Sequence, residues 1–179
     1  RTNHYLRSLT GRTAMTWQVW LRLPSDWQGV ILASSGQRMS GEPISQAFTW
    51  GVWNGTVSFT LATTAGTVTV AATIGIGAWR HVRVVYDGAT LSLAIDGALW
   101  DQEPLTGGIV QGYCEDVTVG CAVSSWPEQG FLTAGYGQIY SLAMSHGAAP
   151  NDGFVPPAVH ESGNWLCLNL ERVERGFVA

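Results

Sequence analysis

The sequence predicts an all-β fold, an antiparallel sandwich or barrel that forms one domain. Segments whose apolar and polar side chains alternate with a period of two recur along the whole chain. This period predicts pleated strands with one buried face. Turn signals rich in Gly, Asn and Asp separate the segments at intervals of roughly 8–12 residues, as is typical of sandwiches and barrels. No segment keeps the 3.6-residue apolar period of a helix for about ten residues.

The clearest strands lie between Trp79 and Asp101, on either side of two Asp-Gly pairs. Asp-Gly supplies the positive φ angles that tight hairpin turns require. We therefore expect Gly88 and Gly97 to occupy turns with positive φ. The alternating apolar positions, expected to face the core, are Val82, Val84 and Tyr86, followed by Leu91, Leu93 and Ile95.

The remaining predicted strands follow in chain order, with Asn54-Gly55 as the strongest hairpin signal between them. Pro24 ends one strand, because proline cannot donate to a sheet ladder. Residues 102–113 form a looser run. The predicted strands are 3–9, 13–23, 30–34, 48–53, 57–63, 67–72, 116–121 and 138–144.

Composition excludes some functions. Only 12% of the 179 residues are charged, the net charge is −4, and there is no lysine. A chain without a basic run has no electrostatic footprint for nucleic acid. No apolar run reaches the length of about 18 residues that a membrane span needs. The chain starts at Arg1 without a signal-like segment, so we interpret it as a processed or excised piece.

The pattern W-x-H-V-x-V-x-Y-D-G-x-x-L-x-L-x-x-D-G, from Trp79 to Gly97, resembles the central hairpin of laminin-G-like domains in the concanavalin A-like superfamily. T-x-x-x-W-L-R at 16–22, V-T-V-G at 117–120 and G-x-I-Y-S-L-A-M-S at 137–145 match further parts of the family in order. The resemblance covers about residues 3–147. It implies an all-β, antiparallel two-sheet jelly-roll sandwich of the concanavalin A-like type, with ligand loops at one rim.

The tail, residues 148–179, departs from this pattern, and we treat residues 1–179 as one domain with a strand-like tail. Residues 164–171 (NWLCLNLE) alternate like a strand. This segment pairs either beside the amino-terminal strand, the arrangement we favour, or with the edge of a neighbouring subunit. Because apolar residues occur on both of its faces, we expect it to be buried on both sides.

The sequence holds three cysteines, Cys114, Cys121 and Cys167. The first two lie at opposite ends of an extended segment and are therefore about 20 Å apart. This separation is too long for a direct disulfide if the strand is straight. We interpret all three as buried free thiols. No C-x-x-C pair occurs and the four histidines are far apart in sequence, which disfavours zinc.

The sequence gives no sign of an active site. Glucanases of this superfamily use carboxylates spaced two residues apart on one strand, but this chain has no E-x-D-x-E pattern. G-x-S-x-G and P-loop motifs are absent too. His81 occupies a position of the family motif within a strand, and we interpret it as structural. We therefore expect no enzymatic activity.

We expect no obligatory cofactor, with calcium as the alternative. The resemblance implies calcium at the rim, and Ca²⁺ prefers oxygen ligands. Most aspartates here lie in Asp-Gly turns, where the side chain already binds local backbone. The acidic candidates near a plausible rim are Asp101, Glu103, Glu115 and Asp116.

Tryptophans are the best ligand candidates, because sugars stack their apolar faces on aromatic rings. Trp126, in the loop SSWPEQ, is the one that we most expect to be exposed. Trp17, Trp20, Trp50 and Trp79 are explained by core or edge packing. The expected ligand-binding residues are Trp126, Trp53, Trp27, Trp100 and Asn54.

Two functional hypotheses follow. The first is a non-catalytic structural subunit of a surface or virion assembly, such as a phage decoration or tail component or an extracellular filament. Low charge and a mean hydropathy of +0.11 favour it, because a dispersed monomer needs more surface charge. The second is a monomeric carbohydrate-binding, lectin-like module of a cell-surface or secreted protein. The expected partners are a glycan or surface protein and further copies of the chain, at an extracellular, cell-surface or virion location.

Overall fold

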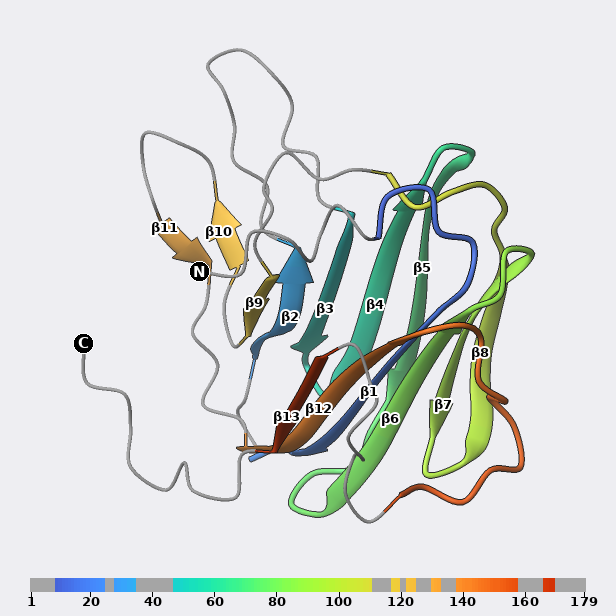
Figure 1. Ribbon diagram of the computed structural model, residues 1–179. Coiled ribbons are helices and arrows are strands. Elements are labelled where there is room, and N and C mark those ends of the chain that lie inside the picture. The colour runs from blue at the N-terminus through green and yellow to red at the C-terminus, as the bar shows by residue number, and fades with distance from the viewer. Residues whose placement is uncertain are drawn as a thin grey trace.

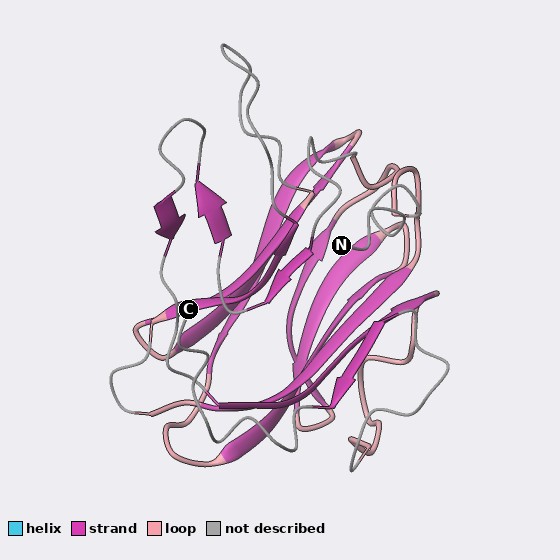
Figure 2. Ribbon diagram, turned by 60° about the vertical axis from the view of Figure 1, so that its left-hand side comes forward, coloured by secondary structure: helices cyan, strands magenta, loops and turns pink. Residues whose placement is uncertain are grey.

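Two antiparallel sheets face each other in a sandwich (Figures 1 and 2). The computed structural model describes residues 9–24, 28–34, 47–110, 117–119, 122–124, 130–132, 138–157 and 166–169. Within these residues the secondary structure is strand and turn without helix, so no helix there is long and apolar enough to cross a membrane. The predicted all-β jelly-roll sandwich is thus confirmed.

The six-stranded sheet has the order β13-β12-β1-β6-β7-β8 and the five-stranded sheet the order β5-β4-β3-β2-β9. A small two-stranded sheet pairs β10 with β11. The strands of the six-stranded sheet are β1 (Met15–Arg22), β6 (Trp79–Tyr86), β7 (Thr90–Ile95), β8 (Ala98–Pro104), β12 (Gln138–His146) and β13 (Leu166–Asn169). The other strands are β2 (Gly29–Ser34), β3 (Phe48–Trp53), β4 (Thr56–Thr63), β5 (Gly66–Thr73), β9 (Val117–Val119), β10 (Ala122–Ser124) and β11 (Gly130–Leu132).

The core lies between the two large sheets and is centred on aromatic rings. Trp17 of β1 packs against Phe59 of β4 at 4.8 Å between ring centroids, and Phe48 and Trp50 of β3 surround the same ring. All four side chains are fully buried. Every residue that the alternation assigned to the core between 82 and 95 is buried, so the predicted inward faces are confirmed.

The two strongest turn signals form the predicted hairpins. Asn54 and Gly55 have φ of 49° and 73°, and Asp96 and Gly97 have φ of 52° and 89°. Two successive positive φ angles characterise type I′ turns, whose twist suits paired strands. Gly88 also has positive φ, at 90°, as the sequence predicts.

The tail strand adds to the sheet of its own chain, and the pairing with the amino-terminal strand that we favoured stays a prediction, because residues 3–8 lie outside the described part. β13 pairs antiparallel with β12, which separates it from β1. The predicted strand 3–9 lies outside the described residues except for Leu9, which lies in a turn. Side chains of 164–171 and of the three cysteines lie outside the described part too, so their burial and redox state stay predictions.

The six-stranded sheet differs from the sequence expectation because the outer face of β6 is also buried from His81 onward. His81, Arg83 and Val85, which alternate with the core residues of β6, are no more than 8% exposed. The cover is a segment that we call the strap, residues 147–157, which follows β12 and lies along the outer face of this sheet (orange in Figure 1). Alternation alone predicted one buried face, because the strap has no strand period that reveals where it packs.

Hydrogen bonds attach the strap along its whole length. Thr16 Oγ1 donates to Gly147 O at 2.8 Å and accepts from Ala149 N. Further along, Gly153 N donates to Gly97 O at 2.8 Å, and Trp20 Nε1 donates to Pro157 O at 2.7 Å. The strap is therefore a fixed layer on the sheet.

At the centre of the strap, Arg83 connects it to the sheet without a carboxylate partner among the described residues. Its guanidinium donates to Gln18 Oε1 and to Pro150 O and lies 3.5 Å from the ring centroid of Phe154. Burial lowers the pKa of Arg83, because desolvation disfavours its charged form. Neutral acceptors and a π face thus replace the usual ion pair.

Candidate ligand-binding sites

One candidate site lies at the β3–β4 turn. Trp53, at the end of β3, points away from the core and is 60% exposed. Beside it in sequence, Asn54 accepts a hydrogen bond through Oδ1 from Gln28 Nε2 at 2.6 Å. Both residues are exposed, and this bond uses neither Asn54 Nδ2 nor Gln28 Oε1. We call Trp53, Asn54 and Gln28 the indole–amide site; it combines an aromatic face with a neutral donor and a neutral acceptor.

Trp79, which we explained by core or edge packing, packs against a neighbouring ring but stays partly exposed. It is 43% exposed and contacts the Tyr140 ring at 6.0 Å between centroids. On β6, Trp79 alternates in step with His81 and not with Val82, which faces the core. This alternation could have indicated from the sequence that Trp79 points away from the core. Ile76, 57% exposed, lies in the preceding loop at the same end of the sandwich.

Trp100 forms no common site with Trp53. It is the extra residue of a bulge in β8, opposite Leu93 and Ala94 of β7, and is 58% exposed. Its strand belongs to the six-stranded sheet, whereas Trp53 lies in the five-stranded sheet. Trp126 and Trp27 lie outside the described residues, so their predicted exposure remains a prediction.

The acidic candidates do not fit a calcium site as far as they are described. Both carboxylate oxygens of Asp101 accept backbone hydrogen bonds, from Ala71 N at 2.7 Å and from Gln102 N at 2.9 Å. Glu103 is exposed on β8, whereas Glu115 and Asp116 lie outside the described residues. Within the described ranges, no group of three His, Cys, Asp or Glu side chains could hold a metal ion.

The aspartates of the Asp-Gly turns have the structural role that the sequence predicts. Desolvation raises the pKa of Asp87, but hydrogen bonds from Ala89 N, Thr90 N and the Thr90 hydroxyl outweigh it and hold the pKa below its ordinary value. Asp96 accepts from His81 N and forms an exposed ion pair with Arg80 at 2.7 Å.

His81 has no access to solvent. Its ring is fully buried and packs edge-on between Trp20, at 5.2 Å, and Phe154, at 5.7 Å. A general base must reach the proton it removes. The structural interpretation of His81 is therefore supported.

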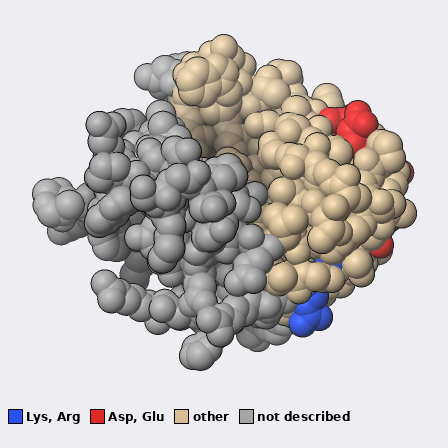
Figure 3. Space-filling model, turned by 90° about the horizontal axis from the view of Figure 1, so that it is seen from above, with Lys and Arg blue, Asp and Glu red and all other residues tan. Residues whose placement is uncertain are grey.

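Described charged side chains are few and scattered, as the view from above in Figure 3 illustrates.

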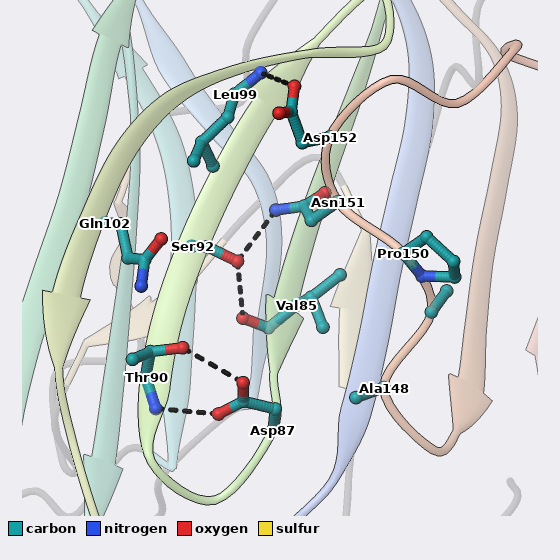
Figure 4. Close-up of a pocket in the computed structure, with 11 residues that line it drawn as sticks. Val85, Asp87, Thr90, Ser92, Leu99, Gln102, Ala148, Pro150, Asn151 and Asp152 are labelled. Atoms are coloured by element: carbon teal, nitrogen blue, oxygen red, sulfur yellow. Dashed lines mark hydrogen bonds between the residues drawn. The ribbon is translucent and has the colours of Figure 1, made fainter.

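A second candidate site is a pocket of about 480 Å³ on the outer face of the six-stranded sheet (Figure 4). We call it the strap pocket. Ser92 of β7 lies at its centre and accepts from Asn151 Nδ2 of the strap at 2.9 Å. Gln102 and Leu99 of β8 form one wall, and the strap forms the other. Sequence reasoning missed these residues, because the pocket exists only where the strap crosses the sheet.

The fold and these sites define a class: a jelly-roll β-sandwich with aromatic and amide side chains exposed on its surface. Residues 2–145 match a laminin G family model described as the concanavalin A-like lectin/glucanases superfamily. The chain belongs to this superfamily. The match ends before the strap begins, so the strap lies outside the part that the family model covers.

Two solved structures share the fold. Mouse laminin α1 chain domains LG4-5 align with a TM-score of 0.55 and 15% identity, over 82% of this chain and 42% of that one. The heptameric SAP-like pentraxin of Limulus polyphemus aligns with a TM-score of 0.56 and 18% identity, over 80% of this chain and 68% of that one. The chain thus spans less than half of the laminin structure. A comparison with curated protein sequences finds no match.

Proposed function

We propose that the protein is a non-catalytic binding module that holds a neutral glycan at the indole–amide site. The observation that carries the proposal is the exposed Trp53 indole, placed beside two hydrogen-bonded amides. A sugar presents an apolar C–H face and a rim of hydroxyls. An indole suits the first, and an amide pair suits the second because it both donates and accepts.

The electrostatics of the site support a neutral ligand. Trp53, Asn54 and Gln28 carry no charge, and the net charge of the chain is −4. Without a cationic partner in the site, a sulfated or carboxylated glycan gains no charge-assisted bond there. A glycan-binding module of this kind would act at an extracellular, cell-surface or virion location.

The experiment measures retention of the protein on immobilised neutral polysaccharides and on a glycan array. Trp53→Ala should weaken binding at least tenfold, since an aromatic anchor contributes much of the affinity at such contacts. Asn54→Gly should weaken it less, while keeping the left-handed turn conformation that Asn54 adopts. Trp100→Ala is the matched control, because that indole is equally exposed but lies on the other sheet. Equal retention of the Trp53→Ala variant and the wild type would refute the proposal.

A second candidate function, as a subunit of a homo-oligomeric assembly, is supported by exposed apolar side chains. Besides the tryptophans, Ile76 and Val155 are 57% and 89% exposed in a chain with few charges. The pentraxin that shares the fold is heptameric. Size-exclusion chromatography with light scattering at micromolar concentration tests this candidate: a stable oligomer supports it, and a monomer without self-association contradicts it.

A further inference from the structure

The strap pocket has the dimensions and shape of a small-molecule site. Its volume of about 480 Å³ lies within the range of roughly 300–1,000 Å³ that ligand pockets occupy. Its floor is formed by the outer face of β6 and β7, and its walls are β8 and the first half of the strap (Figure 4). Because the strap is bonded at both ends, the pocket is already formed without a ligand.

The polar lining of the strap pocket is rich in acceptors and lacks cations. Thr90 Oγ1 donates to Asp87 and keeps its lone pairs as acceptors, whereas Ser92 Oγ donates to Val85 O and already accepts from Asn151 Nδ2. Asp87 and Asp152 accept backbone hydrogen bonds and contribute further oxygens. Among the residues that the structure describes, none that lines the pocket is basic. A phosphate, sulfate or carboxylate would meet two carboxylates without a compensating charge.

Gln102 supplies a neutral amide in the pocket that can both donate and accept. Its side chain extends from β8 toward β7 (Figure 4) and has no hydrogen-bond partner among the described residues. The apolar part of the lining comes from Leu99, which is 39% exposed, together with Val85 and Pro150. The pocket therefore combines an apolar wall with acceptors that need O–H donors.

We propose that the strap pocket is a second ligand site, which binds a neutral polyhydroxylated molecule such as a single unmodified hexose. Hydroxyl groups supply the donors that the acceptor-rich lining requires, and the C–H face of the sugar covers Leu99. A cationic amine gains less at Asp87, because hydrogen bonds from Ala89 N, Thr90 N and the Thr90 hydroxyl already occupy both of its carboxylate oxygens. This inference goes beyond the proposed function: it concerns the opposite sheet and depends on none of the residues of the indole–amide site.

The test titrates the full chain with glucose, galactose and mannose by ligand-observed NMR. Glucuronate and glucose 6-phosphate serve as anionic counterparts, and ethanolamine as a cationic probe. We expect saturable binding of at least one neutral hexose, with a Kd of about 1 mM or weaker, as suits a small ligand. Gln102→Leu should weaken it at least tenfold, and Gln102 is exposed, so the variant should fold. Thr60→Val, a polar-to-apolar change on the five-stranded sheet outside both candidate sites, should leave it unchanged.

Several results would overturn the strap-pocket proposal. These are no saturable binding of any neutral hexose, tighter binding of an anionic counterpart or of ethanolamine, and an unchanged Kd in Gln102→Leu. Loss of hexose binding in Trp53→Ala but not in Gln102→Leu would place the sugar at the indole–amide site. That result would refute the strap pocket and leave the proposed function intact. Conversely, hexose binding that Gln102→Leu abolishes, together with unimpaired polysaccharide retention by Trp53→Ala, would support the pocket and refute the proposed function.

Discussion

The outer faces of the two sheets have similar local chemistry but opposite exposure. On the five-stranded sheet, Ser58, Thr60 and Thr69 lie at partly or fully exposed positions. On the six-stranded sheet, Gln18 and Arg83 are each 8% exposed beneath the strap. Polar residues are thus exposed on one face and buried on the other. Whether a polar group depends on a hydrogen-bond partner within the protein is therefore decided by what covers it in the tertiary structure, and not by residue type.

The energetic consequence is different on the two faces. A polar group that loses its partner on an exposed face is rehydrated, whereas a buried one retains the full cost of desolvation. Removal of a polar partner should therefore lower the free energy of unfolding little on the five-stranded sheet and much more under the strap. The predictions below test this difference, in order of decreasing effect.

Gly97→Ala should have the largest effect, because it combines backbone strain with displacement of the strap. A Cβ at Gly97 would lie 2.1 Å from Phe154 O, and φ is +89°. We expect a loss of about 3 kcal/mol in the free energy of unfolding, measured by urea denaturation. Gly55→Ala is the control: it has φ of +73° with nothing within 4 Å of its Cβ, and should cost about 1 kcal/mol. Equal losses would show that the strap contact contributes nothing.

Arg83→Met should have the next largest effect. The change keeps the apolar stem but leaves Gln18 Oε1 and Pro150 O without their donor under the strap. We expect a loss of about 2 kcal/mol in unfolding free energy, determined by thermal and urea denaturation. Arg80→Met removes an ion pair whose side chains are 40% and 35% exposed, so it should cost less than about 1 kcal/mol. Equal stability of the Arg83→Met and Arg80→Met variants would contradict the expected difference between buried and exposed polar groups.

Acid sensitivity provides a third test, at the Asp87 turn beside the strap pocket. The pKa of Asp87 lies below its ordinary value in the folded protein, because the hydrogen bonds that it accepts outweigh its desolvation. A carboxyl with a lowered folded pKa stabilises the fold above the unfolded pKa, and this contribution is lost as the pH falls through the folded pKa. Asp87→Asn should therefore lose less stability than the wild type below about pH 4. The side chain is largely exposed, so the difference in unfolding free energy should stay under about 1 kcal/mol. Parallel melting-temperature profiles of the two proteins from pH 3 to 6 would contradict this.

Thr60→Val should have the smallest effect, since it concerns the exposed face. The hydroxyls of Thr60 and Thr69 are 2.7 Å apart at exposed positions of neighbouring strands. Water can replace the lost partner, and valine suits a strand, so we expect a change within about 0.5 kcal/mol. A loss as large as that of Arg83→Met would contradict the difference between the two faces.

The local chemistry of individual residues was sufficient to predict some parts of the structure and one part of the candidate site. Gly88 and Gly97 were predicted from Asp-Gly alone, because few residues other than glycine adopt a positive φ readily. The exposure of Trp53 followed from its parity opposite Trp50 on the same strand. The same argument does not carry over to β6, where Trp79 is 43% exposed but His81 and Arg83, which share its parity, are buried.

Most strands, their inward faces and the hairpin turns could be predicted from the sequence alone, because a two-residue period and a positive φ are properties of neighbouring residues. The pairing of β13 with β12, the burial of Arg83 and His81, and the strap pocket arise only in the folded chain. Those features depend on contacts between residues far apart in the chain, such as Thr16 with Gly147, 131 positions away. Local pattern carries no information about such distant partners, whereas the closed sandwich brings them into contact.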